Sequence, residues 1–303
     1  MNALAGAIQL IGGLALAPLL PGSIQALKAR LQGRRGPSPL QPYRELRRLW
    51  GKSSVDPQPT TVLYRLAPCL VAAAMVLGLF LVPIAGLSPN WPLGNDMIVL
   101  VGLFALARFA LAASSWDTGS GFGLMGSSRD LTLSVFAEAL LILVLILAVL
   151  PVGSTDLVAM SSAANGSTVW SQPAHWCAAA AFGLVVLFET GRQPIDNPDT
   201  HLELTMIHEG PLLEYAGRDL ALLQWSAAAR HWIILVLAAE LYLPHWGGFG
   251  ARLACLVGGI ALICVTLAFT ETAQAKMRIL RAPALLGGGC LLALVGLISW
   301  LAS

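Results

Sequence analysis

Carboxylates are the side chains of this sequence best suited to moving protons, and they are distributed unevenly. Only sixteen of the 303 residues are Asp or Glu. Seven of them fall in one stretch: Glu189, Asp196, Asp199, Glu203, Glu209, Glu214 and Asp219. Clustered carboxylates can exchange protons where burial or neighbouring charges shift their pKa values. We therefore expect the 189–219 segment to meet a buried polar path or the surface of a partner.

Three further carboxylates lie inside or at the edge of strongly apolar stretches, at Glu138, Glu240 and Glu271. An ionised group in an apolar span is costly and is usually paired, neutralised or exposed to water. A proton relay and a buried ion pair are equally open for Glu138, which follows Arg129 by nine residues. Glu240 suits an interfacial anchor at the end of its span.

Two of these carboxylates also have purely structural interpretations. Thr200-x-x-Glu203 has the form of a capping box, which would make Glu203 a helix cap. Glu271 suits an ion pair with Lys276 or Arg278, a few residues further along. Spacing alone favours the capping role for Glu203.

Metal and covalent chemistry find little support in the sequence. His201 and His208 are seven residues apart and form no His-Glu-x-x-His motif with Glu209, so we predict no metal site. A Gly-rich phosphate loop and a nucleophile elbow are both missing. Arg108, near the end of an apolar stretch, is most simply a snorkelling side chain, and a role facing a cavity is the second interpretation. The cysteines are scattered singly, which predicts neither disulfides nor an iron–sulfur cluster: Cys69, Cys177, Cys255, Cys264 and Cys290.

Composition places the chain in the membrane. The chain is 56% apolar and 11% charged, with a mean hydropathy of +0.73, whereas a soluble domain is about 25% charged. A span needs about 20 apolar residues, and the sequence offers eight such stretches. We predict an all-α, polytopic, single membrane domain over 1–303, with spans at 3–27, 66–87, 97–114, 131–151, 173–190, 220–243, 251–271 and 283–301. Pro18 and Pro21 are expected to kink or break the first span.

Lys and Arg residues predict the orientation of these spans. They concentrate in the loop at 28–65 and in the later loops of the same side, while the opposite side offers only Arg252. Both termini are therefore expected on the non-cytoplasmic side, with basic 28–65 and acidic 189–219 loops in the cytoplasm.

Within 28–65, Tyr43, Leu46, Leu49 and Trp50 share one helical face, as in a helix lying in the headgroup plane. A solvated basic loop is an equally open interpretation. The small net charge of +2 gives no sign of a nucleic-acid partner.

Several motifs resemble one known family. The run Glu189-Thr190-Gly191-Arg192-Gln193-Pro194-Ile195-Asp196, followed by Thr200-His201-Leu202-Glu203-Leu204, His208-Glu209 and Glu214-Tyr215, closely resembles the long cytoplasmic loop of the membrane subunit of formate hydrogenlyase and hydrogenase 4. That family is homologous to the quinone-site subunit of respiratory complex I, so the resemblance implies a fold like complex I subunit 1. Gly33-Arg34-Arg35-Gly36-Pro37 and Ala275-Lys276-Met277-Arg278 agree with it.

The resemblance assigns proton-relay or coupling roles to nine residues: Glu138, Arg129, Glu189, Arg192, Asp196, Glu203, Glu209, Glu214 and Tyr215. For Glu203 it outweighs the capping role. Complex I subunits carry a further glutamate where this chain has Ala227 and reach their Glu-Tyr pair sooner, which argues against a quinone-reducing site.

The resemblance also implies a function and partners. It implies a subunit, non-catalytic alone, that anchors a peripheral arm to a bacterial or archaeal cytoplasmic membrane and couples it to antiporter-like membrane subunits. The nickel–iron centre and the iron–sulfur clusters are expected in partner subunits, namely the hydrogenase large and small subunits and iron–sulfur subunits, with no cofactor in this chain. Formate, ferredoxin or hydrogen as electron donor, and H⁺ or Na⁺ as coupling ion, are all compatible.

Two rival functions remain open at this point. One is the quinone-site subunit of a complex I-type NADH or ferredoxin dehydrogenase. The other, from a different class, is an autonomous secondary transporter. Many transporters of this class are built from inverted repeats, and the sequence shows none, which argues against this function.

Overall fold

The chain folds as a bundle of long helices. The computed structural model describes residues 2–87, 94–164, 166–196 and 206–302, and these contain no β-strand. The helices are α1 (Asn2–Leu16), α2 (Leu19–Leu31), α3 (Gln41–Trp50), α4 (Val62–Leu81), α5 (Met97–Thr118), α6 (Gly121–Val149), α7 (Leu157–Ala163), α8 (Ser167–Trp170), α9 (Pro173–Glu189), α10 (Gly217–Tyr242), α11 (Phe249–Ala273) and α12 (Ala282–Leu301), with short 3-10 turns η1 (Gly210–Leu212) and η2 (Ile279–Arg281).

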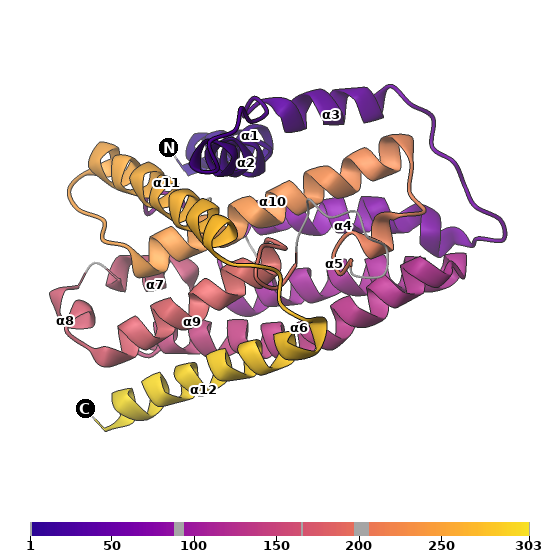
Figure 1. Ribbon diagram of the computed structural model, residues 1–303. Helices are drawn as coiled ribbons and strands as arrows, with labels where there is room; N and C mark the ends of the chain where they lie inside the picture. The colour runs from indigo at the N-terminus through magenta and orange to yellow at the C-terminus, as the bar shows by residue number, and fades with distance from the viewer. Residues whose placement is uncertain (1, 88–93, 165, 197–205, 303) are drawn as a thin grey trace.

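The central layer of the bundle positions the functional site. Figure 1 shows α4, α5, α6, α9, α10 and α12 running in the same general direction. In this layer α4 packs on α5 and α10, α6 packs on α5 and α9, and α12 covers α6 and α9. The part of α10 from Ile233 to Ala239, near its C-terminal end, is buried throughout. Apolar side chains on α11 and α12 remain exposed, as expected of surfaces that meet lipid.

The predicted fold class is confirmed, and within the described residues six helices are long and apolar enough to cross a bilayer. The first predicted span is broken, as its prolines suggested. Its halves, α1 and α2, bend by 41° next to Pro18, and together they count as a seventh span. The remaining predicted span corresponds to α9, which is apolar but has only 17 residues.

The largest boundary error concerns α6, which begins at Gly121, ten residues before the predicted span at 131. Hydropathy located only the lipid-crossing part of this helix. The additional turns carry polar residues that the bundle buries, including Ser127 and Asp130. A helix can extend past the apolar core where its polar side chains find partners inside the protein.

The predicted helix of the first loop exists as α3, which packs against α10 and α2 at the edge of the bundle (Figure 1). Leu49 is buried, whereas Trp50 and the arginines at 44, 47 and 48 are exposed. The Tyr43 hydroxyl donates a hydrogen bond to the Ala15 carbonyl, which ties α3 to α1. The position of α3 at a headgroup surface stays a prediction.

Candidate functional site

A single buried arginine, Arg108 on α5, stands at the centre of the site. Its Nη1 lies 2.7 Å from Glu138 Oε1 of α6, and its Nη2 lies 2.9 Å from Glu189 Oε1 at the end of α9. Its Nε lies 3.6 Å from Asp130 Oδ2, also of α6. Only 2% of the Arg108 side chain is exposed, so three carboxylates share one desolvated guanidinium. The packing of α5 and α9 on α6 brings these groups together.

A second arginine completes the group of charges around Arg108, which we call the inner half of the site. Arg230 of α10 places its Nη1 3.4 Å from the other oxygen of Glu189. Its guanidinium carbon lies 5.3 Å from the centre of the Phe104 ring, and that of Arg108 lies 5.4 Å from the centre of Phe188. Aromatic faces at this range stabilise cations in apolar surroundings. Two guanidiniums thus face three carboxylates, which leaves one excess negative charge.

His208 connects this inner half to the loop that follows α9. Its Nε2 lies 3.7 Å from Asp130 Oδ1, and its Nδ1 lies 3.2 Å from Asp196 Oδ2. Asp196 also accepts a hydrogen bond from the backbone N–H of His208, and its Oδ1 lies 3.0 Å from Lys276 Nζ. The His208 ring stands edge-on to Phe188. A proton on His208 would balance the excess negative charge of the inner half.

Charge and burial act in opposite directions on the loop residues. Burial disfavours the charged form of Asp196, but the hydrogen bond and charge of His208 and the nearby Lys276 hold the pKa of Asp196 well below 3.8. Burial also opposes protonation of His208, yet its hydrogen bond to Asp196 and the charge of Asp130 raise the pKa of His208 above 6.5. His208 is therefore placed to hold a proton near neutral pH.

A second buried ion cluster fixes the same loop on its other side. Arg192 Nη1 lies 3.0 Å from Glu271 Oε1 of α11, and Lys28 Nζ of α2 lies 3.3 Å from Glu271 Oε2. The Glu271 side chain is wholly buried. Nearby, the backbone N–H of Met277 donates to the Pro194 carbonyl. The loop is thereby attached to α2 and α11 as well as to α5 and α6.

Four of the nine predicted site residues belong to these clusters: Glu138, Glu189, Arg192 and Asp196. Arg129 reaches the loop separately, where its Nη1 donates to the Met206 carbonyl over 3.4 Å. Glu209 is half-buried just before η1. Glu203 lies outside the described residues.

The Glu214-Tyr215 pair has a docking role. The Tyr215 ring stacks on Tyr64 of α4 with centres 4.4 Å apart, and its hydroxyl donates to the Tyr64 carbonyl. The Tyr64 hydroxyl donates in turn to the Glu214 carbonyl. Burial raises the pKa of Tyr215 to about 12, so it stays a neutral hydrogen-bond donor. These contacts hold the end of the loop against the bundle.

The sequence did not predict several of the charged side chains that pair with these carboxylates. The prediction that Arg108 snorkels is wrong, because its guanidinium turns into the bundle. Glu271 pairs with Arg192 and Lys28, not with Lys276 or Arg278. Pairing every charged residue of an apolar span with an opposite charge would have identified Arg108, and also Arg230. Among the described residues, no group of three or more metal-ligand side chains is placed to hold a metal ion.

Comparison with known proteins identifies the family. A family model described as NADH dehydrogenase matches residues 5–301. The chain belongs to the NADH dehydrogenase family. Within this family, formate hydrogenlyase subunit 4 of Escherichia coli (strain K12) is 31% identical over 320 residues, covering 100% of both chains. Hydrogenase-4 component C of the same organism is 34% identical over 298 residues, covering 95% of this chain and 92% of the relative. The resemblance drawn from the Glu189–Tyr215 motifs is thus confirmed.

The fold of this family member also matches a solved structure. A chain from the archaeal respiratory membrane complex called membrane-bound sulfane sulfur reductase superposes with a TM-score of 0.86, covering 100% of this chain and 99% of that one. At 19% identity the match establishes the shared fold of these two chains. The chain is accordingly a multi-pass membrane protein with relatives in multisubunit membrane complexes.

Proposed function

We propose that this chain is the membrane-anchoring and energy-coupling subunit of a hydrogenase complex. The observation that carries the proposal is the connected ion network from the 190–196 loop through His208 to Arg108, in a chain similar over its whole length to formate hydrogenlyase subunit 4. The chain itself would catalyse no redox step. Its partners would be the hydrogenase large and small subunits, iron–sulfur subunits and antiporter-like membrane subunits, which would carry the nickel–iron centre and clusters.

The network offers a physical route for coupling. Electron transfer in an arm docked on the loop would change the field at Asp196 and His208, the outermost members of the network. His208 neutralises the inner excess charge only while protonated, so losing its proton would alter the proton affinity of Asp130 and of the carboxylates around Arg108. The event in the arm would thereby become a change in protonation inside the membrane.

The far end of the network points sideways out of the bundle. Glu138 keeps 27% of its side chain exposed, and Val135 and Ile142, one turn to either side on the same face of α6, are also exposed. A carboxylate facing lipid at this depth is costly. We infer that a neighbouring membrane subunit covers this face and receives the proton. Passage straight across the chain is unfavourable, because Ile233 to Ala239 of α10 form a buried apolar layer.

Replacing Glu138 tests the relay. Glu138→Gln keeps an acceptor for Arg108 but removes the titratable group. We expect the complex to assemble and evolve hydrogen normally, while proton translocation in inverted vesicles falls by about 100-fold, the contribution of a positioned proton-transfer group. Glu45→Gln, in an exposed pair on α3, is the matched control and should pump normally. A normal proton gradient in the Glu138 variant would refute the relay.

Purification from the native membrane in mild detergent tests the identity of the complex. We expect nickel, iron and hydrogen-evolving activity to copurify with the tagged chain. A quinone-reducing complex without nickel would instead establish the complex I-type role. Recovery of the chain alone, with transport activity after reconstitution, would establish a transporter.

The orientation belongs to the same proposal. We infer a bacterial or archaeal cytoplasmic membrane, with the 190–196 loop and His208, which we call the loop cluster, on the cytoplasmic side and both termini on the other side. The distribution of Lys and Arg supports this orientation, and Figure 1 shows both termini towards the same end of the bundle. Cysteine labelling from either side of the membrane, at exposed Leu280 and at Leu301, checks it.

A further inference from the structure

The N-terminal end of α6 extends further than a membrane crossing requires. Its 29 residues span about 44 Å at 1.5 Å per residue, whereas about 20 residues cross the hydrocarbon. The polar residues Ser127 to Asp130 separate the surplus from the apolar part of the helix. Figure 1 shows this end of α6 reaching beyond the start of α12, where the last span begins. The first two turns of α6 therefore stand outside the hydrocarbon.

Neighbouring helix ends hold this extension in place. The Asp117 carboxylate, at the end of α5, accepts hydrogen bonds from the backbone N–H groups of Thr61 and Tyr64 at the start of α4. The α5–α6 hairpin is closed up to its turn, because a Cβ on Gly123 would lie 3.9 Å from Cβ of Ser115. The ends of α4, α5 and α6 thus form one packed surface at the end of the bundle that carries the loop cluster.

Large apolar side chains are exposed on this surface. They belong to all three helices: Val62, Leu63, Trp116, Phe122 and Met125. Phe122 is 47% exposed and Met125 is 46% exposed, and both precede the polar residues of α6. Lipid tails do not reach side chains outside the hydrocarbon, so water or a protein must cover these two. Clustered apolar surface facing water is typical of a protein-binding site.

Arg129 adds a positive charge to the same face of α6. It follows Met125 by four residues and Phe122 by seven, a spacing that aligns the three side chains. Its Nη1 donates to the Met206 carbonyl, and no described Asp or Glu forms an ion pair with it. The buried arginines of the ion clusters, in contrast, all face carboxylates of this chain. The half-buried Arg129 is therefore complementary to an acidic group of another protein.

The opposite end of the bundle uses its charges internally. Glu240 is 1% exposed there, so it is not the interfacial anchor that its sequence position suggested. Its carboxylate accepts hydrogen bonds from the Ala85 backbone N–H and the Ser161 hydroxyl. Arg252 lies over the same turn, where a Cβ on Gly86 would be 2.8 Å from its Nη1. These contacts tie the segments of that end to one another.

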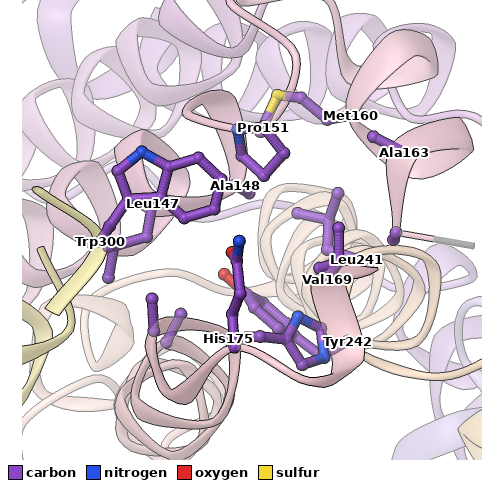
Figure 2. Close-up of a pocket in the computed structure, with 14 residues that line it drawn as sticks. Leu147, Ala148, Pro151, Met160, Ala163, Val169, His175, Leu241, Tyr242 and Trp300 are labelled. Atoms are coloured by element: carbon purple, nitrogen blue, oxygen red, sulfur yellow. The ribbon is translucent and has the colours of Figure 1, made fainter. Parts of the chain in front are cut away.

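The cavity at that end is also unsuited to a protein partner. Its volume is about 30 Å³, room for about two water molecules, and Leu147, His175, Tyr242 and Trp300 are among the residues that line it (Figure 2). Among the described residues of its lining, none is Lys, Arg, Asp or Glu. The exposed apolar surface of α4, α5 and α6 is therefore the better candidate for a protein contact.

We propose that the face of α6 formed by Phe122, Met125 and Arg129 is a docking surface for a water-soluble subunit of the complex. The partner covers the two apolar side chains and pairs a carboxylate with Arg129. It is a subunit of the peripheral arm, so the docking surface rests on the proposed function. Met206, which Arg129 holds, is two residues from His208. A subunit docked here therefore contacts the chain that leads into the ion network.

A photo-crosslinker at Met125 in the native complex tests the docking surface. We expect an adduct with a water-soluble subunit, identified by mass spectrometry. Leu262 of α11, which is 56% exposed on an apolar span, is the control position and should give no such adduct. Adducts of Met125 with lipid, with an integral membrane subunit or with a second copy of the chain, or no adduct at all, would overturn the proposal.

Substitutions on the same face provide a second measurement. Phe122→Asp and Arg129→Glu should each release the soluble subunit from the tagged chain about tenfold faster, an effect within the range of interface hot spots. Arg129→Lys should restore part of the retention. Phe249→Asp is the matched control, because Phe249 is 52% exposed at the start of α11, at the opposite end of the bundle. Equal retention in Phe122→Asp and Phe249→Asp would refute the docking surface.

The docking surface and the hydrogenase function fail in different ways. If the subunit captured at Met125 is soluble but belongs to a quinone-reducing complex without nickel, the docking surface stands and the hydrogenase function fails. If nickel and hydrogen evolution copurify with the chain while Met125 captures only membrane subunits, the function stands and the docking surface fails.

Discussion

At the scale of single residues, the site is organised by charge balance. The carboxylates Asp130, Glu138 and Glu189 all lie within 3.6 Å of the Arg108 guanidinium, and Asp130 and Glu189 are buried. Buried charges of this kind are tolerable only together. Removing one partner therefore leaves the others exposed to the full desolvation penalty.

Removing the charge of Arg108 should destabilise the subunit severely. Arg108→Gln leaves these three carboxylates, among the described residues, with Arg230 and His208 as their nearest cationic groups, and breaking a buried ion pair typically costs about 3–5 kcal/mol. We expect a strong loss of folded subunit in the membrane and of thermal stability in detergent. Arg44→Gln, on the exposed face of α3, is the control. Near-normal stability of the Arg108 variant would show that the cluster is not ionised as described.

The loop should dock in a pH-dependent way. Because the pKa of His208 is raised above 6.5 in the folded state, its protonation stabilises the docked loop below pH 6.5, and this stabilisation is lost as pH rises through the raised pKa. The lowered pKa of Asp196 gives a contribution present above pH 3.8 and lost as pH falls through the lowered value.

Hydrogen exchange of residues 206–216, corrected for intrinsic rates, measures this effect. We expect protection to be greatest in weak acid, between the two limits, and exchange to become several-fold faster in alkaline buffer. In His208→Gln the alkaline change should vanish. An unchanged pH profile in that variant would contradict the assignment to His208.

The sequence allowed prediction of acids more readily than of their partners. Glu138 and Glu189 were predicted from apolar surroundings and motif, since a carboxylate in a span needs a reason. Arg108 was misassigned because a long side chain near the end of a span can reach either water or the interior, and only packing decides which. The link through His208 joins residues far apart in the chain, so no local pattern indicates it.

At the scale of elements, the contact between α6 and the loop leaves no space for a side chain. A Cβ on Gly126 of α6 would lie 2.7 Å from Cα of Gly210 in η1. The backbone of the loop therefore rests directly on α6, next to Asp130. This close approach fixes the distance at which His208 meets Asp130.

Gly126→Ala should separate the loop from α6. Overpacking of this kind costs about 1–3 kcal/mol, and the shift would lengthen the His208–Asp130 contact. We expect faster hydrogen exchange in 206–216 and weaker retention of the peripheral arm during purification. Gly102→Ala is the matched control, because a Cβ there meets nothing within 4 Å. Equal behaviour of the two variants would argue against the contact.

Elements were predictable where hydropathy or proline chemistry decides them. The break beside Pro18 and the helix at α3 follow from local sequence. The early start of α6 does not, because its first turns are polar and gain their stability from buried partners. The same dependence on tertiary contacts explains why the loop path was not predictable.

At the scale of the whole molecule, the exposed face around Glu138 should be an interface. A photo-crosslinker at Val135, which is exposed on that face, should capture an antiporter-like membrane subunit identified by mass spectrometry. A probe at Leu280, exposed in η2 near Lys276, should capture peripheral subunits instead. Lipid adducts alone at Val135 would contradict the lateral transfer of protons.

The apolar layer of α10 has an electrical consequence. It is a region of low dielectric constant between two charged groups, so part of a membrane potential falls across Ile233 to Ala239. Each elementary charge moved across 100 mV corresponds to about 2.3 kcal/mol. Arg230 and Glu240 thus lie at opposite ends of this low-dielectric segment. The voltage across the bilayer should therefore act on the charge at one end of this segment relative to the charge at the other, with no movement of the helix between them.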